Sequence, residues 1–242
     1  MVETLMLRLL HFRLCPFSRS IRLLLAELKI EVELTEERPW EWRKEFVALN
    51  PAGDLPVLIL ANGHPVCGAY AISEYIAEDM ALRPRDADPE PLKNPPIFPG
   101  DRLARAETRR LVDWFHRKFQ AEVTEPLLEE KLLMRLRGNA TQTPDSDILK
   151  SVQKSIRYHV SYAAYLAEDR NWLSGEHMSF ADFAAAGHIS CVDYLGDMDW
   201  PAESPLKLWY ARMKSRPSLR AILSERIPGA PMPPANYANP DF

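Results

Sequence analysis

The stretch NPAGDLPVLIL, residues 50–60, followed by ANGHPV, residues 61–66, decides the fold. Its apolar run Val57-Leu58-Ile59-Leu60 and the later Pro65-Val66 flank an Asn62-Gly63 pair. Asn-Gly is a typical hairpin turn, because both residues accept a positive φ. Two antiparallel strands are therefore expected here.

The residues before this hairpin predict a strand, a helix and a second strand. Residues 6–12 form a short apolar run, and residues 30–35 alternate between apolar and polar side chains. Between them, apolar residues recur at helical spacing over residues 17–28, with Pro16 at the helix start. A further helix is expected over residues 71–80. A βαβ unit followed by two antiparallel strands and a helix is typical of the thioredoxin-like α/β fold.

The remainder of the chain is predicted to be helical. Six prolines fall within residues 81–100, and proline lacks a backbone donor and breaks helices. Helical patterns follow, with Pro126 expected to kink or end the first, a polar loop over 138–147, and runs at 102–120, 148–169, 180–195 and 205–223. The predicted organisation is α/β plus all-α: a thioredoxin-like domain (1–82), a proline-rich linker (83–101), an all-helical domain (102–224) and a proline-rich tail (225–242).

The composition is that of an ordinary soluble protein. Apolar residues make up 46%, charged residues 26%, and the formal net charge is −4. No concentrated basic face suggests nucleic-acid binding. The N-terminus predicts neither a signal peptide nor membrane insertion. The cysteines Cys15, Cys67 and Cys191 are odd in number and widely spaced, so a reduced, cytoplasmic protein is expected.

Three motifs resemble the glutathione transferase superfamily in their order and spacing. They are CPFSRSIR at residues 15–22, NPAGDLPVL at residues 50–58 and SFAD at residues 179–182. The resemblance covers roughly residues 5–223. It implies a glutathione-transferase-type helical domain after the thioredoxin-like domain, and a homodimer.

The resemblance also implies roles for single residues. Cys15 or Ser18 would be the catalytic group at a helix N-terminus, and glutathione the bound thiol. Leu55 and Pro56 match the cis-proline loop, where the backbone before the proline pairs with glutathione. Ser179 and Asp182 match an N-cap box, which serves folding.

The glutathione site departs from the family pattern at two positions. An acid and a serine are expected just before Ala-Ile, and Gly68 and Ala69 stand there instead. Each lost hydrogen bond to a charged group is worth roughly 1.5–3 kcal/mol, so affinity for glutathione should fall about a hundredfold or more. Asp54 places a further negative charge near an anionic ligand. The histidines show no metal-ligand spacing, so no metal site is expected, and His188 reads as a core residue.

Further features resemble the FzlA-like proteins, the branch of this superfamily that binds the tubulin homologue FtsZ in bacterial cell division. They lie in residues 109–124, in the Gly68–Ile72 stretch and in the tail. The aromatics Tyr237 and Phe242 are candidate protein-binding anchors among the tail prolines, although the tail could instead be disordered or pack over its own domain.

Two tryptophans, Trp40 and Trp42, follow the second predicted strand and form another interface candidate. They could be exposed or could cover the sheet.

Two functions follow from these observations. The first is a non-catalytic adaptor that binds FtsZ filaments. The alternative is an active glutathione transferase, omega-like, with Cys15 as the nucleophile of thiol transfer or with glutathione conjugated to an electrophile.

Overall fold

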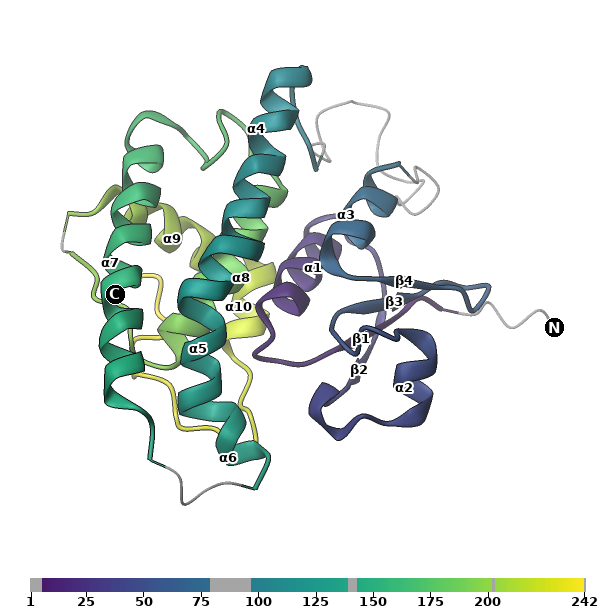
Figure 1. Ribbon diagram of the computed structural model, residues 1–242. Helices are drawn as coiled ribbons and strands as arrows, with labels where there is room; N and C mark the ends of the chain where they lie inside the picture. Colours follow the sequence, from purple (N-terminus) through teal and green to yellow (C-terminus); the bar gives the residue numbers. More distant parts are fainter. Residues whose placement is uncertain (1–5, 79–96, 139–142, 202, 242) are drawn as a thin grey trace.

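The computed structural model describes residues 6–78, 97–138, 143–201 and 203–241. An α/β domain packs beside a larger helical domain (Figure 1). The first domain contains β1 (Arg8–His11), α1 (Pro16–Glu27), β2 (Glu33–Glu36), the 3-10 turn η1 (Pro39–Glu41), α2 (Lys44–Leu49), β3 (Val57–Ile59), β4 (Pro65–Cys67) and α3 (Ala69–Glu78). The predicted order of strands and helices is confirmed, and η1 and α2 are additions to it.

The sheet has the strand order β2-β1-β3-β4. β1 pairs with β2 in parallel, whereas the β1–β3 and β3–β4 pairs are antiparallel. Leu9 and Leu58 are cross-strand partners and are fully buried, because the sheet forms part of the core. The expected hairpin of β3 and β4 is confirmed, but its turn differs. Gly63 has a φ of +82°, whereas Asn62 does not have the positive φ of a two-residue Asn-Gly turn. Leu60 N–H donates to the His64 carbonyl at 2.9 Å, so the loop has three residues and Gly63 takes the left-handed position.

The second domain consists of helices throughout. It contains α4 (Arg102–Asp113), the π-helical η3 (Trp114–Thr124), α5 (Glu125–Leu128), the π-helical η4 (Glu129–Leu133), α6 (Met134–Leu136), α7 (Ser146–Asp169), α8 (Phe180–Tyr194), α9 (Pro205–Ser215) and α10 (Pro217–Leu223). The first five of these form one continuous helical segment, so of the two outcomes expected at Pro126, a kink or an end, the helix does not end there. Pro126 is the second residue of α5, directly after the π-helical segment η3.

The helix predicted over 205–223 is divided in two. Arg216 has a ψ of 136°, an extended conformation, and Pro217 follows it. A residue before proline is disfavoured in the helical region, which explains the break. The linker predicted at 83–101 lies mostly outside the described residues.

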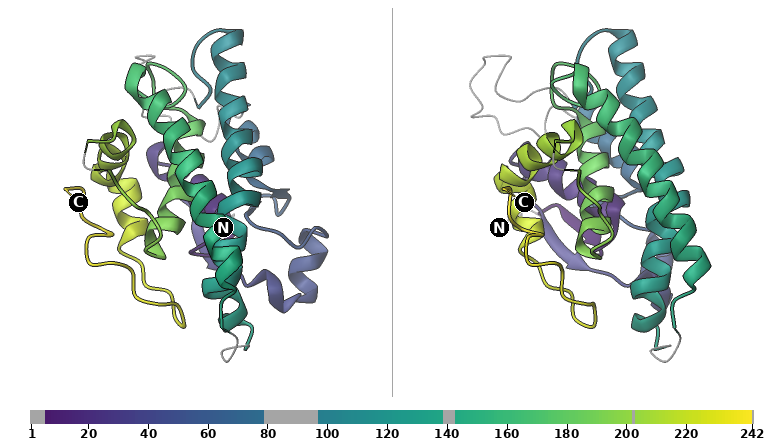
Figure 2. Two further views of the ribbon diagram at one scale, coloured as in Figure 1. Left: turned by 60° about the vertical axis from the view of Figure 1, so that its left-hand side comes forward. Right: turned by 90° about the vertical axis from the view of Figure 1, so that its left-hand side faces the viewer.

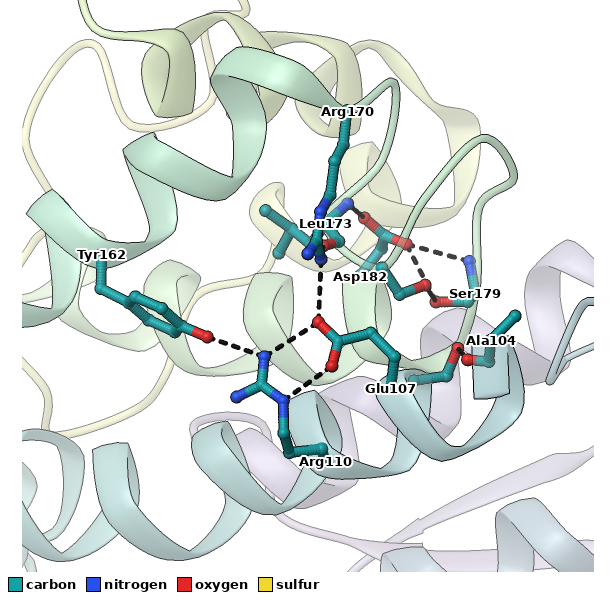
Figure 3. A network of polar contacts seen from close by, with 10 residues as sticks. Ala104, Glu107, Arg110, Tyr162, Arg170, Leu173, Ser179 and Asp182 are labelled. Atoms are coloured by element: carbon teal, nitrogen blue, oxygen red, sulfur yellow. Dashed lines mark hydrogen bonds and ion pairs between the residues drawn. The ribbon is translucent and has the colours of Figure 1, made fainter. Parts of the chain in front are cut away.

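The buried helix α8 begins at the predicted capping box. The side chain of Ser179 accepts a hydrogen bond from Ala181 N–H, and Asp182 accepts from Ser179 N–H at 2.9 Å. Asp182 also accepts from Leu173 N–H at 3.0 Å and from the indole N–H of Trp209 at 2.9 Å. Figure 3 shows Asp182 between Ser179 and Leu173. The box therefore anchors α8 to the loop before it and to α9.

A second polar network in Figure 3 joins α4 to α7. Arg110 forms a bidentate pair with Glu107 at 2.7 and 2.9 Å and donates to the Tyr162 hydroxyl at 2.7 Å. Arg170 donates to the same Glu107 carboxylate at 2.9 Å. These contacts hold the two long helices together along their polar edge.

The two domains meet where α1 lies against α8. A Cβ at Gly187 would lie 2.5 Å from the Pro16 carbonyl oxygen, so only glycine allows this approach. Arg19 of α1 is buried and donates to the Ser190 hydroxyl of α8 at 2.8 Å. The α/β domain is thus fixed to the helical domain by backbone contact and by a buried guanidinium.

The tail after α10 folds back over the molecule, drawn in yellow in Figure 2. Tyr237 is 1% exposed, packs edge-on against Tyr194 at 5.3 Å, and accepts a hydrogen bond from Arg19 at 3.1 Å. The tail therefore packs over its own domain, one of the alternatives left open by the sequence. Tyr237 is not available as the exposed anchor proposed for it, and Phe242 lies outside the described residues.

Candidate functional site

A cleft of about 550 Å³ opens between the two domains. Its α/β side carries aromatic residues and the loop before the cis-proline, and its helical side is formed by η3, α5, η4 and the residues just after α6. The lining residues are Phe12, Leu14, Cys15, Pro16, Phe17, Pro39, Trp40, Trp42, Gly53, Asp54, Leu55, Gln120, Glu125, Leu128, Glu129, Leu133 and Arg137. The structure thus brings four predicted site residues together: Cys15, Leu55, Trp40 and Trp42.

Cys15 occupies the N-cap of α1, at the position expected for a catalytic thiol. Its Sγ accepts a hydrogen bond from Ser18 N–H at 3.5 Å and lies 3.9 Å from the Leu55 carbonyl oxygen. Burial raises the pKa of the Cys15 thiol, hydrogen bonds from Ser18 oppose that rise, and the Asp54 carboxylate adds to it. Because the thiolate is the nucleophile, a raised pKa disfavours nucleophilic chemistry at neutral pH.

Ser18, the other catalytic candidate, is fully buried and does not line the cleft. Its hydroxyl accepts from Phe12 N–H at 3.5 Å. This contact ties the first turn of α1 to the end of β1, which is a structural role.

Of the four positions matched to the glutathione site, Leu55, Pro56, Gly68 and Ala69, Leu55 alone is among the residues that line the cleft. The Leu55–Pro56 peptide bond is cis, and Gly68 N–H donates to the Pro56 carbonyl at 2.9 Å. Gly68 has a φ of +86°, and a Cβ there would meet no atom within 4 Å. Ala69 begins α3 and is 5% exposed. These two positions therefore offer no side-chain hydrogen bond to a ligand.

The loop after β2 presents both tryptophans to the cleft. Trp40 packs edge-on against Phe12, with ring centroids 5.1 Å apart. Trp42 is 63% exposed and lies over Gly53, where an added Cβ would be 2.8 Å from its ring.

A buried carboxylate holds this tryptophan loop in place. Glu37 is 2% exposed and pairs with Arg43 at 2.6 Å. This ion pair joins the two ends of the loop that carries Trp40 and Trp42, and so it restrains the loop.

Several residues that line the cleft carry no signal in the sequence. Gln120, Glu125, Glu129 and Arg137 line the helical wall of the cleft. They belong to an ordinary polar helix face, and only the packing of the two domains shows that this face borders a cleft. Asp54 was singled out, and the structure places it at the cleft, where its Oδ1 accepts from the Asn50 amide at 2.5 Å.

A chain of buried hydrogen bonds crosses the domain interface. His116 Nδ1 lies 3.1 Å from His188 Nε2. The other ring nitrogen of His188, Nδ1, lies 2.9 Å from the Thr124 hydroxyl. His116 Nε2 lies 3.5 Å from the Ser20 hydroxyl of α1. His188 is thus a hydrogen-bonded core histidine, as expected. In the described part of the chain, no group of three or more His, Cys, Asp or Glu side chains could hold a metal ion.

Comparison with known proteins establishes the class. The family model described as glutathione S-transferase, N-terminal domain, matches residues 14–79, and that of the C-terminal domain matches residues 139–226. The chain belongs to the glutathione S-transferase superfamily.

Within this superfamily, the chain is similar to FtsZ-localized protein A of Caulobacter vibrioides. The two are 40% identical over 235 residues, which cover 96% of each chain. The solved structure of FzlA from C. crescentus matches with a TM-score of 0.88 at 40% identity, over 98% of this chain and 100% of that one. A glutathione S-transferase structure from Rhodospirillum rubrum F11 matches with a TM-score of 0.87, also at 40% identity, over 98% of this chain and all of the other. Among the described helices, none is both long and apolar enough to span a membrane.

Proposed function

We propose that this chain is a non-catalytic adaptor that binds FtsZ filaments in the cytoplasm of a dividing bacterium. The observation that supports this most is the 40% identity to FtsZ-localized protein A, which extends over 96% of both chains. A likeness of that extent includes both domains and the tail, beyond the fold that all glutathione transferases share.

The geometry of the cleft supports the non-catalytic part of the proposal. Gly68 and Ala69 have no polar side chain with which to hold the γ-glutamyl end of glutathione. Burial raises the pKa of the Cys15 thiol, so a thiolate is disfavoured. Asp54 adds a negative charge where an anionic ligand would enter. All three features oppose glutathione chemistry.

Co-sedimentation with FtsZ tests the proposal. The chain should pellet with FtsZ filaments formed in GTP and remain in the supernatant with unassembled FtsZ in GDP. Trp42→Ala should reduce pelleting, because this indole is 63% exposed on the candidate surface. Leu103→Ala is the matched control, since Leu103 is 80% exposed on α4, away from the cleft. No pelleting at saturating FtsZ would refute the proposal.

Deletion of residues 228–242 is a poor test of the tail. It would remove the buried Tyr237 together with any contact surface. Met232→Ser is the better variant, because Met232 is 74% exposed and its loss leaves the packing of Tyr237 in place. Reduced pelleting of a stably folded Met232→Ser variant would support a binding role for the tail, and unchanged pelleting would exclude this residue from it.

We also propose a homodimer, as is common in the superfamily. Light scattering coupled to size-exclusion chromatography should give twice the chain mass of 27.7 kDa. A mass equal to a single chain at micromolar concentration would contradict the proposal.

An active glutathione transferase is the second candidate, favoured by the position of Cys15. Its thiol caps α1, accepts a backbone N–H and lines the cleft, which is the placement a nucleophile needs. Glutathione-dependent thiol transfer to a mixed disulfide should then be measurable and should be abolished by Cys15→Ala. The adaptor proposal expects no difference between the two proteins in this assay.

A further inference from the structure

The cleft carries acidic side chains that are not balanced by cations. Asp54 lies on the wall of the α/β domain, and Glu125 and Glu129 lie on the helical wall. Of the described lining residues only Arg137 is cationic, and it pairs with Glu129 at 2.6 Å. Asp54 and Glu125 have no basic partner in the described part of the chain. The cleft therefore favours a positively charged occupant.

Aromatic side chains lie beside these carboxylates. Trp40, Trp42, Phe12 and Phe17 all line the cleft, and Trp42 is 63% exposed. The face of an aromatic ring attracts a cation, tryptophan most strongly and arginine most often among the cations. A guanidinium also stacks on such rings, because it is planar and weakly hydrated. This wall suits a cation with an apolar stem.

We infer that the cleft binds an arginine side chain presented by a partner polypeptide. The guanidinium is neutralised by Asp54 and Glu125 and stacks on the tryptophans. The volume of about 550 Å³ exceeds a single side chain and falls within the range of about 300–1,000 Å³ typical of ligand sites. The residues flanking the arginine therefore enter with it. This inference goes beyond the proposed function, because it names the chemistry recognised and holds whichever partner presents it.

The indole N–H signals of the protein provide the test. Trp40→Phe and Trp42→Phe assign the two signals, which are then followed by two-dimensional NMR as acetyl-Gly-Arg-Gly-amide is added at low salt. Saturable shifts of both signals are expected. Acetyl-Gly-Glu-Gly-amide should give none, and spermidine should bind more weakly than the arginine peptide.

Charge-neutralising variants test the carboxylates. Asp54→Asn and Glu125→Gln should each weaken the arginine peptide about fivefold, the effect of one partly exposed ion pair. Asp147→Asn removes an exposed carboxylate on α7, outside the cleft, and should leave binding unchanged. The spectra themselves show that each variant is folded.

Three results would overturn the inference. They are the absence of saturable shifts with the arginine peptide, equal binding of the glutamate peptide, and tighter binding of spermidine than of the arginine peptide. The first two would reject a cation site, and the third would reject a polypeptide as its occupant. None of these measurements involves FtsZ, so the inference and the proposed function can fail separately.

Discussion

Lowering the pH from 7.5 to 5.5 should destabilise this protein through its buried histidines. Burial lowers the pKa of His116 from 6.5 to about 3, with Asp113 opposing the shift slightly. Burial lowers that of His11 to about 4, and the positive charge of Arg22 adds to the effect. The pKa of His188 also falls well below its usual value, first by burial and then by its histidine neighbours. All three side chains are therefore neutral in the folded protein.

The sign follows from proton binding by the unfolded chain. Unfolded histidines take up protons as the pH falls through 6.5, and the folded ones do not, so stability is present above pH 6.5 and is lost below it. At pH 5.5 each such histidine lowers the free energy of unfolding by about 1.4 kcal/mol relative to its value at neutral pH. His11 and His116 together cost about 2.7 kcal/mol between pH 7.5 and 5.5. His188 acts in the same direction.

Urea unfolding, monitored by tryptophan fluorescence at pH 7.5, 6.5 and 5.5, measures this loss. His11→Leu should reduce the loss by about 1.4 kcal/mol, because one titrating group is removed from the folded core. His64→Gln is the control, since it removes an exposed histidine and leaves every buried one in place. A free energy of unfolding that stays almost constant between pH 7.5 and 5.5 would contradict this prediction. Salt-bridged acids such as Glu107, with a pKa lowered to about 2 by Arg110, act only at lower pH.

Three substitutions test the packing. Gly187→Ala should lower stability by about 1–3 kcal/mol, because the new Cβ meets the Pro16 carbonyl at 2.5 Å and this outweighs the ~1 kcal/mol gain in helix propensity; a raised urea midpoint would contradict the close approach of α1 and α8. Tyr237→Ala should cost about 3–5 kcal/mol, whereas Tyr237→Phe should cost about 1 kcal/mol because Arg19 loses an acceptor; wild-type stability of the alanine variant would show that the tail is outside the core. Asp182→Ala leaves two backbone N–H groups and an indole N–H without acceptors. The free energy of unfolding should therefore fall by at least ~3 kcal/mol in equilibrium unfolding. A fall of less than ~1 kcal/mol would contradict the role given to Asp182.

Local signals were sufficient to predict the architecture. The β3–β4 hairpin and the Ser179–Asp182 box each depend on a few neighbouring residues, and both are present in the structure. The break at Pro217 could also have been predicted, because the residue before a proline disfavours helix. The continuation through Pro126 could not, since no residue pattern signals it.

Only part of the cleft lining could be predicted from the sequence. Cys15, Leu55 and the tryptophans come from motifs or from an unusual local composition. Gln120 and Glu125 lie on a helix whose polar residues resemble any solvated face, so their role depends on how the domains dock. The alternatives left open for Tyr237 could not be decided from the sequence for the same reason. Its burial depends on a long-range contact with Arg19, and a proline-rich tail gives no local sign of such a partner.

Isothermal titration calorimetry with reduced glutathione tests most directly the claim that a transferase fold here operates without its usual ligand. With Gly68 and Ala69 in place of the acid and the serine, and with the acidic Asp54 at the cleft, the titration should show no saturable heat up to millimolar glutathione. Binding in the low micromolar range would contradict the account and would favour an active transferase with Cys15 as its nucleophile.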